Sequence, residues 1–333
     1  MMSVTIKDVA REAGVSYASV SRILSNKGRF SEATAQRVRK VAAELGYFKN
    51  KAASDLSSNA PRVIGVVMPQ SHTNFADSLM QGIYDASKAD GFDIIISYMG
   101  GDDDKAQSAA IENLVSRNIA GILLLSIQLK VEHVKRLQHS KLPFISVSVT
   151  LPYDIATVTS DDFDLGYQAC QFLIAQGHRR IALVGPQVND QTVGTQRLKG
   201  YQQALAEHQI SFDEALVFPG AFDYESGERL LQRETILERF TAVIAASDMV
   251  ALGVMNAAKD QGISIPEQLS LISIDGTNLT QLTRPRITAI QQDFHQMGEV
   301  ATRMIIQNIM ANQPLYTTRI ANHLLMGQTV AKI

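Results

Sequence analysis

The sequence predicts an α-helical amino-terminal domain, a short hinge, and a two-lobed core of parallel α/β sheets. Two patterns carry this prediction. Residues 4–45 read as three short amphipathic helices separated by glycine-containing turns. From Arg62 onward, short apolar runs alternate with helical stretches, and the alternation restarts after about Asp161, which predicts two α/β units in succession.

Length and composition indicate an ordinary globular protein. The chain has 333 residues, of which 45% are hydrophobic, enough for two or three compact units. It has one cysteine, Cys170, which excludes a disulfide framework and a thiolate zinc cage. No apolar run approaches the roughly 18 residues of a membrane span, and the polar start lacks the apolar segment of a secretory signal. We therefore expect a cytoplasmic protein without a membrane partner.

Charge is distributed unevenly along the chain. Up to Arg62 there are 11 basic and 5 acidic residues, a formal charge of +6, whereas the whole chain carries −2 and the remainder therefore −8. A basic amino-terminal segment followed by an acidic remainder indicates that only the amino-terminal segment binds a polyanion such as DNA. Chance clustering of charges on a solvated surface is the alternative.

The first helices have the pattern of a helix-turn-helix. Residues 4–13 form an amphipathic stripe that Gly14 ends, and Ser16 is placed to cap a second helix over 17–25. A longer helix over 31–45 braces the pair. The polar side of the second helix suits the DNA major groove, because Arg22 can fork onto guanine and Ala18 can lie against a thymine methyl. A small three-helix unit that binds proteins is the alternative.

Four motifs make the prediction specific: VTIKDVA over 4–10, AGVS over 13–16, SVSR over 19–22 and LGY over 45–47. In this order and spacing they resemble the amino-terminal signature of the LacI/GalR family of bacterial repressors. The resemblance implies a homodimer on a near-palindromic operator, with Tyr17 and Ala18 choosing the half-site sequence. The candidate DNA-contacting residues are Thr5, Ser16, Tyr17, Ala18, Ser21, Arg22, Asn26, Arg29, Tyr47, Asn50, Ala53 and Leu56.

Residues 50–61 are predicted to form a hinge helix and linker behind the helix-turn-helix domain of residues 1–49. The helical spacing of Ala52, Ala53 and Leu56 supports a helix, but one this short is marginal alone in water. It should order only when two copies pack together on DNA. The resemblance assigns Leu56 the role of an apolar wedge in the minor groove. An ordinary linker leucine that packs on the core is the alternative.

The core, residues 62–333, is predicted from its short apolar runs. The resemblance implies a periplasmic-binding-protein-like fold whose chain crosses between lobes near residues 161, 290 and 320. Lobe one would comprise 62–161 and 291–320, and lobe two 162–290 and 321–333. The predicted parallel strands are 62–68, 92–97, 119–126, 144–149, 180–185, 241–246, 269–274 and 287–290, followed by a last strand-like segment over 320–326.

A ligand is expected at the carboxyl ends of the strands, where the lobes face each other. Arg197 supplies a bidentate donor and Asp275 can accept sugar hydroxyls, while the same two charges could pair across an empty cleft. Asp248 is expected to cap the helix that follows it. Phe294 has two open roles, pocket or core packing. The candidate effector-binding residues are Phe75, Ser126, Ser148, Arg197, Phe222, Ser247, Asp275 and Gln292.

The absence of catalytic motifs favours a regulator over an enzyme. The sequence has no G-x-G-x-x-G or Walker-type loop, no G-x-S-x-G elbow and no H-E-x-x-H, so we expect neither catalysis nor a cofactor or metal. A solute-binding protein without a regulatory role would carry a signal peptide instead of the basic amino-terminal segment. We expect a repressor of a carbohydrate-utilisation operon, switched by a sugar or sugar phosphate.

Two points stay open at this stage. The effector could instead be a purine or nucleoside stacked on Phe75 and Phe222. No leucine heptads follow the segment 320–326, which favours a dimer over a tail-linked tetramer, and helices over 77–89 and 226–239 could supply its interface.

Overall fold

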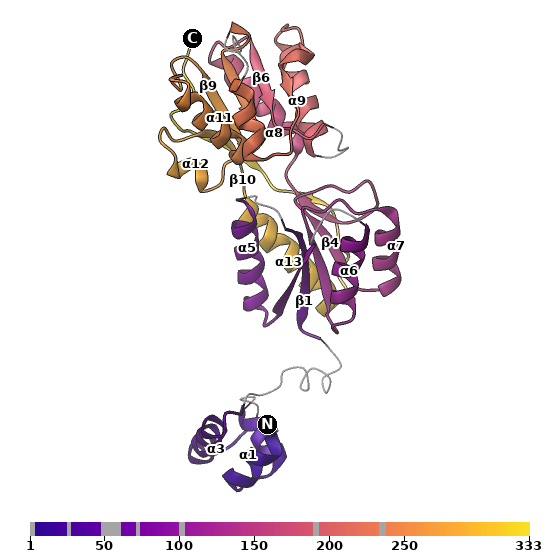
Figure 1. Cartoon of the computed structure of the whole chain (residues 1–333). Helices are drawn as coiled ribbons and strands as arrows, with labels where there is room; N and C mark the ends of the chain where they lie inside the picture. The colour runs from indigo at the N-terminus through magenta and orange to yellow at the C-terminus, as the bar shows by residue number, and fades with distance from the viewer. Residues whose placement is uncertain are drawn as a thin grey trace. The chain divides into compact units, whose positions relative to one another are not determined.

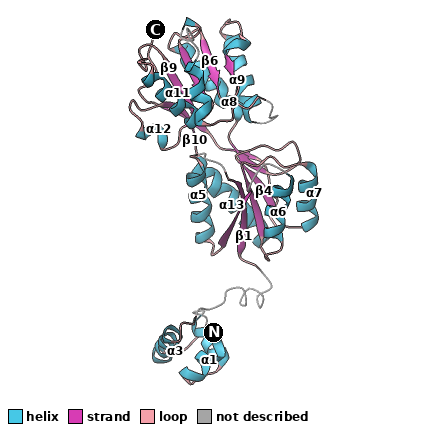
Figure 2. Cartoon of the chain, viewed as in Figure 1, coloured by secondary structure: helices cyan, strands magenta, loops and turns pink. Residues whose placement is uncertain are grey.

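The computed structural model divides the chain into two compact units, Met1–Pro61 and Arg62–Ile333. The structure describes residues 4–24, 28–47, 61–70, 74–99, 104–188, 193–232 and 238–333. Figure 1 follows the chain through both units, and Figure 2 separates its helices from its strands. Each unit has its own apolar core, and they are described separately.

The first unit contains the three helices that the sequence predicts: α1 (Ile6–Ala13), α2 (Tyr17–Leu24) and α3 (Glu32–Glu44). The chain turns sharply after α1 because Gly14 adopts a left-handed φ of 63°, which costs little without a Cβ. One cluster of buried side chains joins the helices: Val9, Ala13, Val20, Ile23, Ala35, Val38 and Ala42. The helix-turn-helix prediction is therefore confirmed. The predicted hinge helix over 50–58 lies outside the described residues.

Lobe one of the second unit is a six-stranded sheet with helices on both faces. Helices α5 (Ala76–Ala89) and α13 (Phe294–Ala311) cover one face, and α6 (Asp104–Val115) and α7 (Val131–Ser140) cover the other. Both faces are buried, which explains why its central strands read as unbroken apolar runs. In spatial order the strands are β11 (Thr318–Arg319), β5 (Thr157–Thr159), β4 (Phe144–Val147), β3 (Gly121–Leu125), β1 (Val63–Pro69) and β2 (Asp93–Met99).

Lobe two repeats this layering. Helices α8 (Asp162–Ala175) and α9 (Val193–Glu207) cover one face, and α11 (Asp248–Asp260) packs on the other, beside the short α10 (Tyr224–Glu228). A four-residue helix, α12 (Leu279–Leu282), follows β9. In spatial order the strands are β12 (Asn322–Leu325), β10 (Thr288–Gln292), β9 (Ser270–Asp275), β8 (Ala242–Ala245), β6 (Ile181–Val184) and β7 (Val217–Phe218).

The chain passes between the lobes three times. It leaves β5 for α8 through Asp161, leaves β10 for α13 through Asp293, and runs from β11 to β12 through residues 320–321. Two of these connections are joined directly, because Arg319 Nη1 donates to Asp161 Oδ2 at 2.6 Å. All three connections lie at the junction of the two lobes. The carboxyl ends of the central strands of each sheet face the other lobe there (Figure 1).

The two-sheet prediction is confirmed, and the differences from it are local. The last strand-like segment, for which no direction was predicted, forms β12 and pairs antiparallel with β10. Strands β5, β7 and β11 were not predicted because they have only two or three residues each, too few for periodicity to show. The predicted helix over 226–239 is wrong in its described part, because α10 ends at Glu228 and a 3₁₀ helix over Arg229–Gln232 follows; residues 233–237 lie outside the described residues. Among the described residues, no helix is both long and apolar enough to cross a membrane.

Candidate DNA-contacting face and effector site

Helix α2 presents the polar face that the sequence predicts for DNA contact. Val20 and Ile23 are buried in the core of the first unit, while Tyr17, Ala18 and Arg22 are exposed; Tyr17 keeps 57% of its surface. Ser21 is half-buried beside them. Side chains on one exposed face of a helix next to a tight turn are placed to enter a groove. Their contacts with DNA stay predictions.

The remaining candidates of the first unit have local structural roles as well. Ser16 Oγ accepts from the backbone N–H of Ser19 at 3.1 Å, so this hydroxyl caps α2. At the start of α1, the Thr5 hydroxyl donates to Asp8 Oδ2 at 2.7 Å. Arg29 is exposed, whereas Tyr47 is half-buried against the core, and burial raises the pKa of its phenol. Asn26, Asn50, Ala53 and Leu56 lie outside the described residues.

The second unit contains a cavity of about 620 Å³ that residues of both lobes line. This volume is within the range of small-molecule sites. All eight candidate effector-binding residues line it: Phe75, Ser126, Ser148, Arg197, Phe222, Ser247, Asp275 and Gln292. The sequence prediction therefore brings together residues that are spread over more than 200 positions, and their contact with an effector stays a prediction.

The fold places these side chains at strand ends. Ser126 and Ser148 directly follow β3 and β4, while Asp275 and Gln292 end β9 and β10. Four of the lining residues have a left-handed backbone: φ is 50° at Ser126, 70° at Ser148, 59° at Phe222 and 114° at Asp275. A positive φ costs a residue with a Cβ about 1–3 kcal/mol, and such positions concentrate at ligand sites. Here the local conformation turns each side chain toward the space between the lobes.

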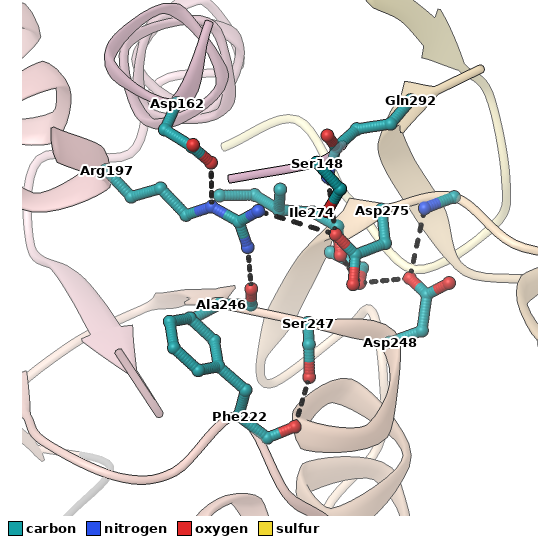
Figure 3. A network of polar contacts seen from close by, with 12 residues as sticks. Ser148, Asp162, Arg197, Phe222, Ala246, Ser247, Asp248, Ile274, Asp275 and Gln292 are labelled. Carbon is teal, nitrogen blue, oxygen red and sulfur yellow. Dashed lines mark hydrogen bonds and ion pairs between the residues drawn. The ribbon is translucent and has the colours of Figure 1, made fainter. Parts of the chain in front are cut away.

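Arg197 is the centre of the polar network that Figure 3 draws. Its Nε donates to Asp162 Oδ1 at 3.0 Å, and its Nη1 donates to the carbonyl oxygen of Ala246. Nη2 lies 3.6 Å from Asp275 Oδ1, and the guanidinium carbon lies 5.6 Å from the centroid of the Phe222 ring. The arginine is only 5% exposed, so its charge depends on these carboxylates. A guanidinium has five N–H donors, which leaves capacity for a ligand oxygen.

The ion pair between Arg197 and Asp275 does not span the cleft. Arg197 belongs to α9 and Asp275 ends β9, so both belong to lobe two. The expectation of a pair that closes across the empty cleft is therefore wrong. Its reason is topological: α9 packs on the face of the sheet to which β9 belongs, and this brings its inward-facing arginine to the end of that strand.

Asp275 is a buried carboxylate with an altered pKa. Gln292 Nε2 donates to Asp275 Oδ1 at 2.7 Å, and the residue is 8% exposed. The pKa of Asp275 is raised to about 7, mainly by burial and also by the nearby carboxylates of Asp248 and Asp162, although Arg197 and the Gln292 hydrogen bond lower it. This group can therefore change its charge near neutral pH.

Ser247, which lines the cavity as predicted, also takes the capping role that the sequence predicts for Asp248. Ser247 caps α11, since its Oγ accepts from the N–H of Val250 at 3.2 Å, and it also donates to the carbonyl oxygen of Phe222 at 2.7 Å. Asp248 does not cap α11; its carboxylate holds the loop after β9 and accepts from the N–H groups of Gly276 and Thr277. A serine N-cap is as favourable as an aspartate N-cap, so pattern alone could not separate them.

The aromatic residues resolve the open question about Phe294. Its ring stacks on that of Phe75, with centroids 4.8 Å apart, and it is 4% exposed while it also lines the cavity. Both proposed roles, core packing and pocket wall, are thus present in one residue. Phe75 is half-buried, and one face of its ring is occupied by Phe294.

Several lining residues were not predicted from the sequence: Gln107, Gln128, Lys130, Tyr153 and Gln187. They lie on helix α6 and on loops after β3, β4 and β6. Strand periodicity does not mark such positions, and none carries a motif. The general rule that loops after parallel strands form the ligand site is the one signal that could have found these residues, with the exception of Gln107 on α6.

The pKa of Asp275 predicts a pH dependence of stability. Its pKa is about 7 in the folded chain and has a reference value of 3.8, so folding favours the protonated form. The contribution is fully present below about pH 4 and is lost as the pH rises through about 7. Urea unfolding should therefore show that the wild type loses stability from about pH 5 to about pH 8 relative to Asp275→Asn. Parallel curves for the two proteins would contradict the assignment.

Comparison with known proteins agrees with the two units. Residues 5–50 match the model of bacterial regulatory proteins of the lacI family, and residues 170–330 match that of a periplasmic binding protein-like domain. The chain is 32% identical to catabolite control protein A of Priestia megaterium over 309 residues, which cover 91% of this chain and 92% of that protein. It is also 32% identical to the HTH-type transcriptional repressor CytR of Escherichia coli K12, over 92% of this chain and 89% of CytR.

A solved structure shows the same core. The regulator CcpA from Weissella paramesenteroides, with bound glucose, superimposes with a TM-score of 0.74 at 29% identity, and it covers 82% of this chain and 99% of its own. A helix-turn-helix unit joined to a two-lobed core with a polar cavity defines a ligand-responsive DNA-binding protein. The chain belongs to the LacI family of bacterial regulatory proteins and is a transcriptional regulator.

Proposed function

We propose that the protein is a cytoplasmic, homodimeric repressor of carbohydrate-utilisation genes, and that a sugar-like effector in the cavity sets its affinity for a near-palindromic operator. One observation carries the proposal. The same chain has an exposed polar face on α2 and a cavity that Arg197, Asp275 and Gln292 line. The first suits a DNA groove, and the second offers the donors and acceptors that hydroxyl groups bind.

A sugar fits the chemistry of the cavity better than an apolar ligand. Arg197 donates, the Asp275 carboxylate accepts, and the Gln292 carboxamide does both, so neighbouring hydroxyls of one ring could each find a partner. The ring of Phe222 lies beside them and can pack on the apolar face of a sugar. The relative with bound glucose supports this reading.

The mechanism is a two-state equilibrium. Ligand between the lobes favours one lobe angle, the angle sets the spacing of the two hinge segments of the dimer, and that spacing decides whether they pair on DNA. The shift is limited by the difference in ligand affinity between the two states. Release of DNA and tighter binding are both consistent with it, and the sign is read from the titration below.

A titration of operator binding tests the proposal. The operator is selected by the protein from a random DNA pool, and its affinity is measured by fluorescence anisotropy with and without each of a series of sugars at fixed salt. We expect at least one sugar to change the operator Kd about 5- to 150-fold. Asp275→Ala should keep the operator affinity and lose the response. An unresponsive wild type, or a responsive Asp275→Ala, would contradict the assignment of the cavity.

Arg22 is expected to supply base specificity. Arg22→Ala should lose about 1–3 kcal/mol of discrimination against operators that lack the guanine it contacts. Arg37→Ala, an exposed arginine on α3, is the matched control and should keep the full discrimination. The measurement compares Kd values for the selected operator and its single-base variants. Unchanged discrimination in Arg22→Ala would place base reading elsewhere on the first unit.

A purine or nucleoside is the second candidate effector, and one observation favours it. Phe75 is half-buried at the cavity wall, next to Phe294, so a planar base could extend this aromatic stack. Adenosine, cytidine, hypoxanthine and guanine therefore belong in the same operator titration. A response to one of them without a response to any sugar would favour this candidate.

A further inference from the structure

The cavity is also lined by polar residues other than Arg197, Asp275 and Gln292. One group of them lies toward the α6–α7 side of lobe one, opposite the side that Phe75 and Phe294 form with α5 and α13. Three carboxamides make up this group: Gln107 from α6, Gln128 from the loop after β3, and Gln187 from the loop after β6 in lobe two. We refer to this group as the glutamine end. Gln107 and Gln128 are hydrogen-bonded neighbours, and the Gln187 backbone lies beside Gly194, the residue after Val193, whose side chain packs on the apolar cluster of this side.

The carboxamide of Gln107 is only half satisfied by hydrogen bonds within the described residues. The residue is 4% exposed, and its Nε2 donates to the carbonyl oxygen of Gln128 at 3.0 Å. Its Oε1 is buried and has no hydrogen-bond partner within the part of the chain that the structure describes. An unsatisfied buried acceptor is unfavourable, and the few that proteins retain often serve a ligand or a bound water. This acceptor calls for a donor such as a hydroxyl group.

The walls of the glutamine end suit a ring. Tyr153, half-buried, and Val193, at the start of α9, both line it and both pack against the apolar core between α6, α7 and the sheet. An aromatic ring and an aliphatic side chain bordered by carboxamides form the kind of site that binds a neutral sugar. The apolar faces of the sugar pack on the apolar walls, and its hydroxyls bind groups that both donate and accept hydrogen bonds. Lys130 also lines the cavity, and it has contacts of its own.

The volume also exceeds one ring. At roughly 30 Å³ per water molecule in the liquid, 620 Å³ corresponds to about twenty water molecules. A hexose has about twelve non-hydrogen atoms, each of which takes less space than a water molecule, so one hexose does not fill the cavity. One hexose bound by Arg197, Asp275 and Gln292 would leave the glutamine end to water.

We propose that the glutamine end is a second sugar subsite, and that the effector is a neutral disaccharide or glycoside. Its first ring binds Arg197, Asp275 and Gln292, and its second ring lies between Gln107, Gln187 and Tyr153. The inference rests on the proposed function, and it adds the size of the ligand and the residues that select it. Since Gln107 and Gln187 belong to different lobes, the second ring also bridges the lobes and strengthens its effect on their angle.

Calorimetric titration of the full-length protein tests the subsite. The probes are glucose, galactose, fructose, cellobiose, maltose, lactose, sucrose and glucose 6-phosphate. The variants are Gln187→Ala, whose side chain is exposed, and Gln107→Leu, with Gln313→Ala on the surface outside the cavity as the matched control. We expect one disaccharide to bind at least about tenfold more tightly than its component monosaccharides. Each cavity variant should weaken it about three- to tenfold, the range of one hydrogen bond, without changing monosaccharide affinity.

Each outcome of these titrations either supports or overturns the second subsite. A monosaccharide that binds as tightly as every disaccharide, or a cavity variant that weakens both classes equally, overturns the second subsite and leaves the proposed function standing. Tightest binding of glucose 6-phosphate also overturns it, in favour of an anion at Lys130. Binding of none of the probes to the wild type counts against both proposals. If Gln107→Leu does not fold, Gln187→Ala alone carries the comparison.

Discussion

Arg197→Ala is expected to lower the free energy of unfolding of the second unit by about 3–5 kcal/mol, the cost of breaking a buried ion pair by removing one partner. The substitution removes the guanidinium that pairs with Asp162 and Asp275 and that donates to the carbonyl oxygen of Ala246. The same change should abolish effector binding. Urea unfolding and calorimetric titration measure the two effects.

The pH provides an internal control for this prediction. Without Arg197 the pKa of Asp275 should rise further, because the arginine charge lowers it. The deficit should therefore be smaller at about pH 5, where Asp275 is protonated, than at about pH 8. Arg179→Ala, an exposed arginine just before β6, should change stability by less than about 0.5 kcal/mol at either pH. A deficit below about 1 kcal/mol, or one independent of pH, would mean that the carboxylates are solvated after the substitution.

The fold was predictable because apolar residues recur with a different spacing in the amino-terminal unit and in the core. Residues 4–45 repeat at helical spacing, and the predicted helix ends agree with α1, α2 and α3 to within two residues. In the core, strands such as β3 and β8 are buried along their whole length, so they appear as apolar runs. Strand β12 lies at the edge of its sheet with Leu324 exposed, and its reversed direction left no trace in the pattern.

The candidate effector site was predictable as far as it lies at strand ends. Asp275 and Ser148 could be found because a polar residue after a buried strand has few other roles. The pairing of Arg197 with Asp162 could not, since it depends on how α9 packs against α8. Gln107 was not predicted for a similar reason: it belongs to α6, and only the tertiary fold brings that helix to the cavity wall.

Asp248 illustrates a residue whose importance the sequence suggested for the wrong reason. Its two carboxylate oxygens accept four hydrogen bonds from the end of β9 and the loop that follows: Ser273 Oγ at 2.5 Å, Gly276 N–H at 3.2 Å, Thr277 N–H at 2.6 Å and Thr277 Oγ1 at 2.7 Å. This loop begins at Asp275, whose φ is 114°, and continues through Gly276, where a Cβ would lie 2.7 Å from Gln291 Cα. The carboxylate therefore holds Asp275 in an unfavourable backbone conformation that places it in the cavity.

Asp248→Ala is expected to lower the free energy of unfolding by about 1–3 kcal/mol or more, because the buried N–H of Gly276 loses its acceptor at about 1–3 kcal/mol and the half-buried N–H of Thr277 loses its acceptor as well. The loop should then relax, so the affinity of a bound sugar should fall at least about tenfold even at temperatures where the variant is fully folded.

The conservative variant separates positioning from stability. Asp248→Asn keeps one acceptor oxygen but turns an NH₂ group toward the other donors, so it should lose stability and sugar affinity together, by less than the alanine variant. Thr277→Val removes only the Oγ1 hydrogen bond and should cost about 0.5–1.5 kcal/mol with little change in affinity, because the backbone N–H bonds that fix the loop remain. Urea unfolding and calorimetric titration of the three variants give both quantities. If Asp248→Ala loses stability but binds the sugar as the wild type does, Asp275 keeps its conformation without Asp248, and the loop geometry is set by β9 and β10 alone.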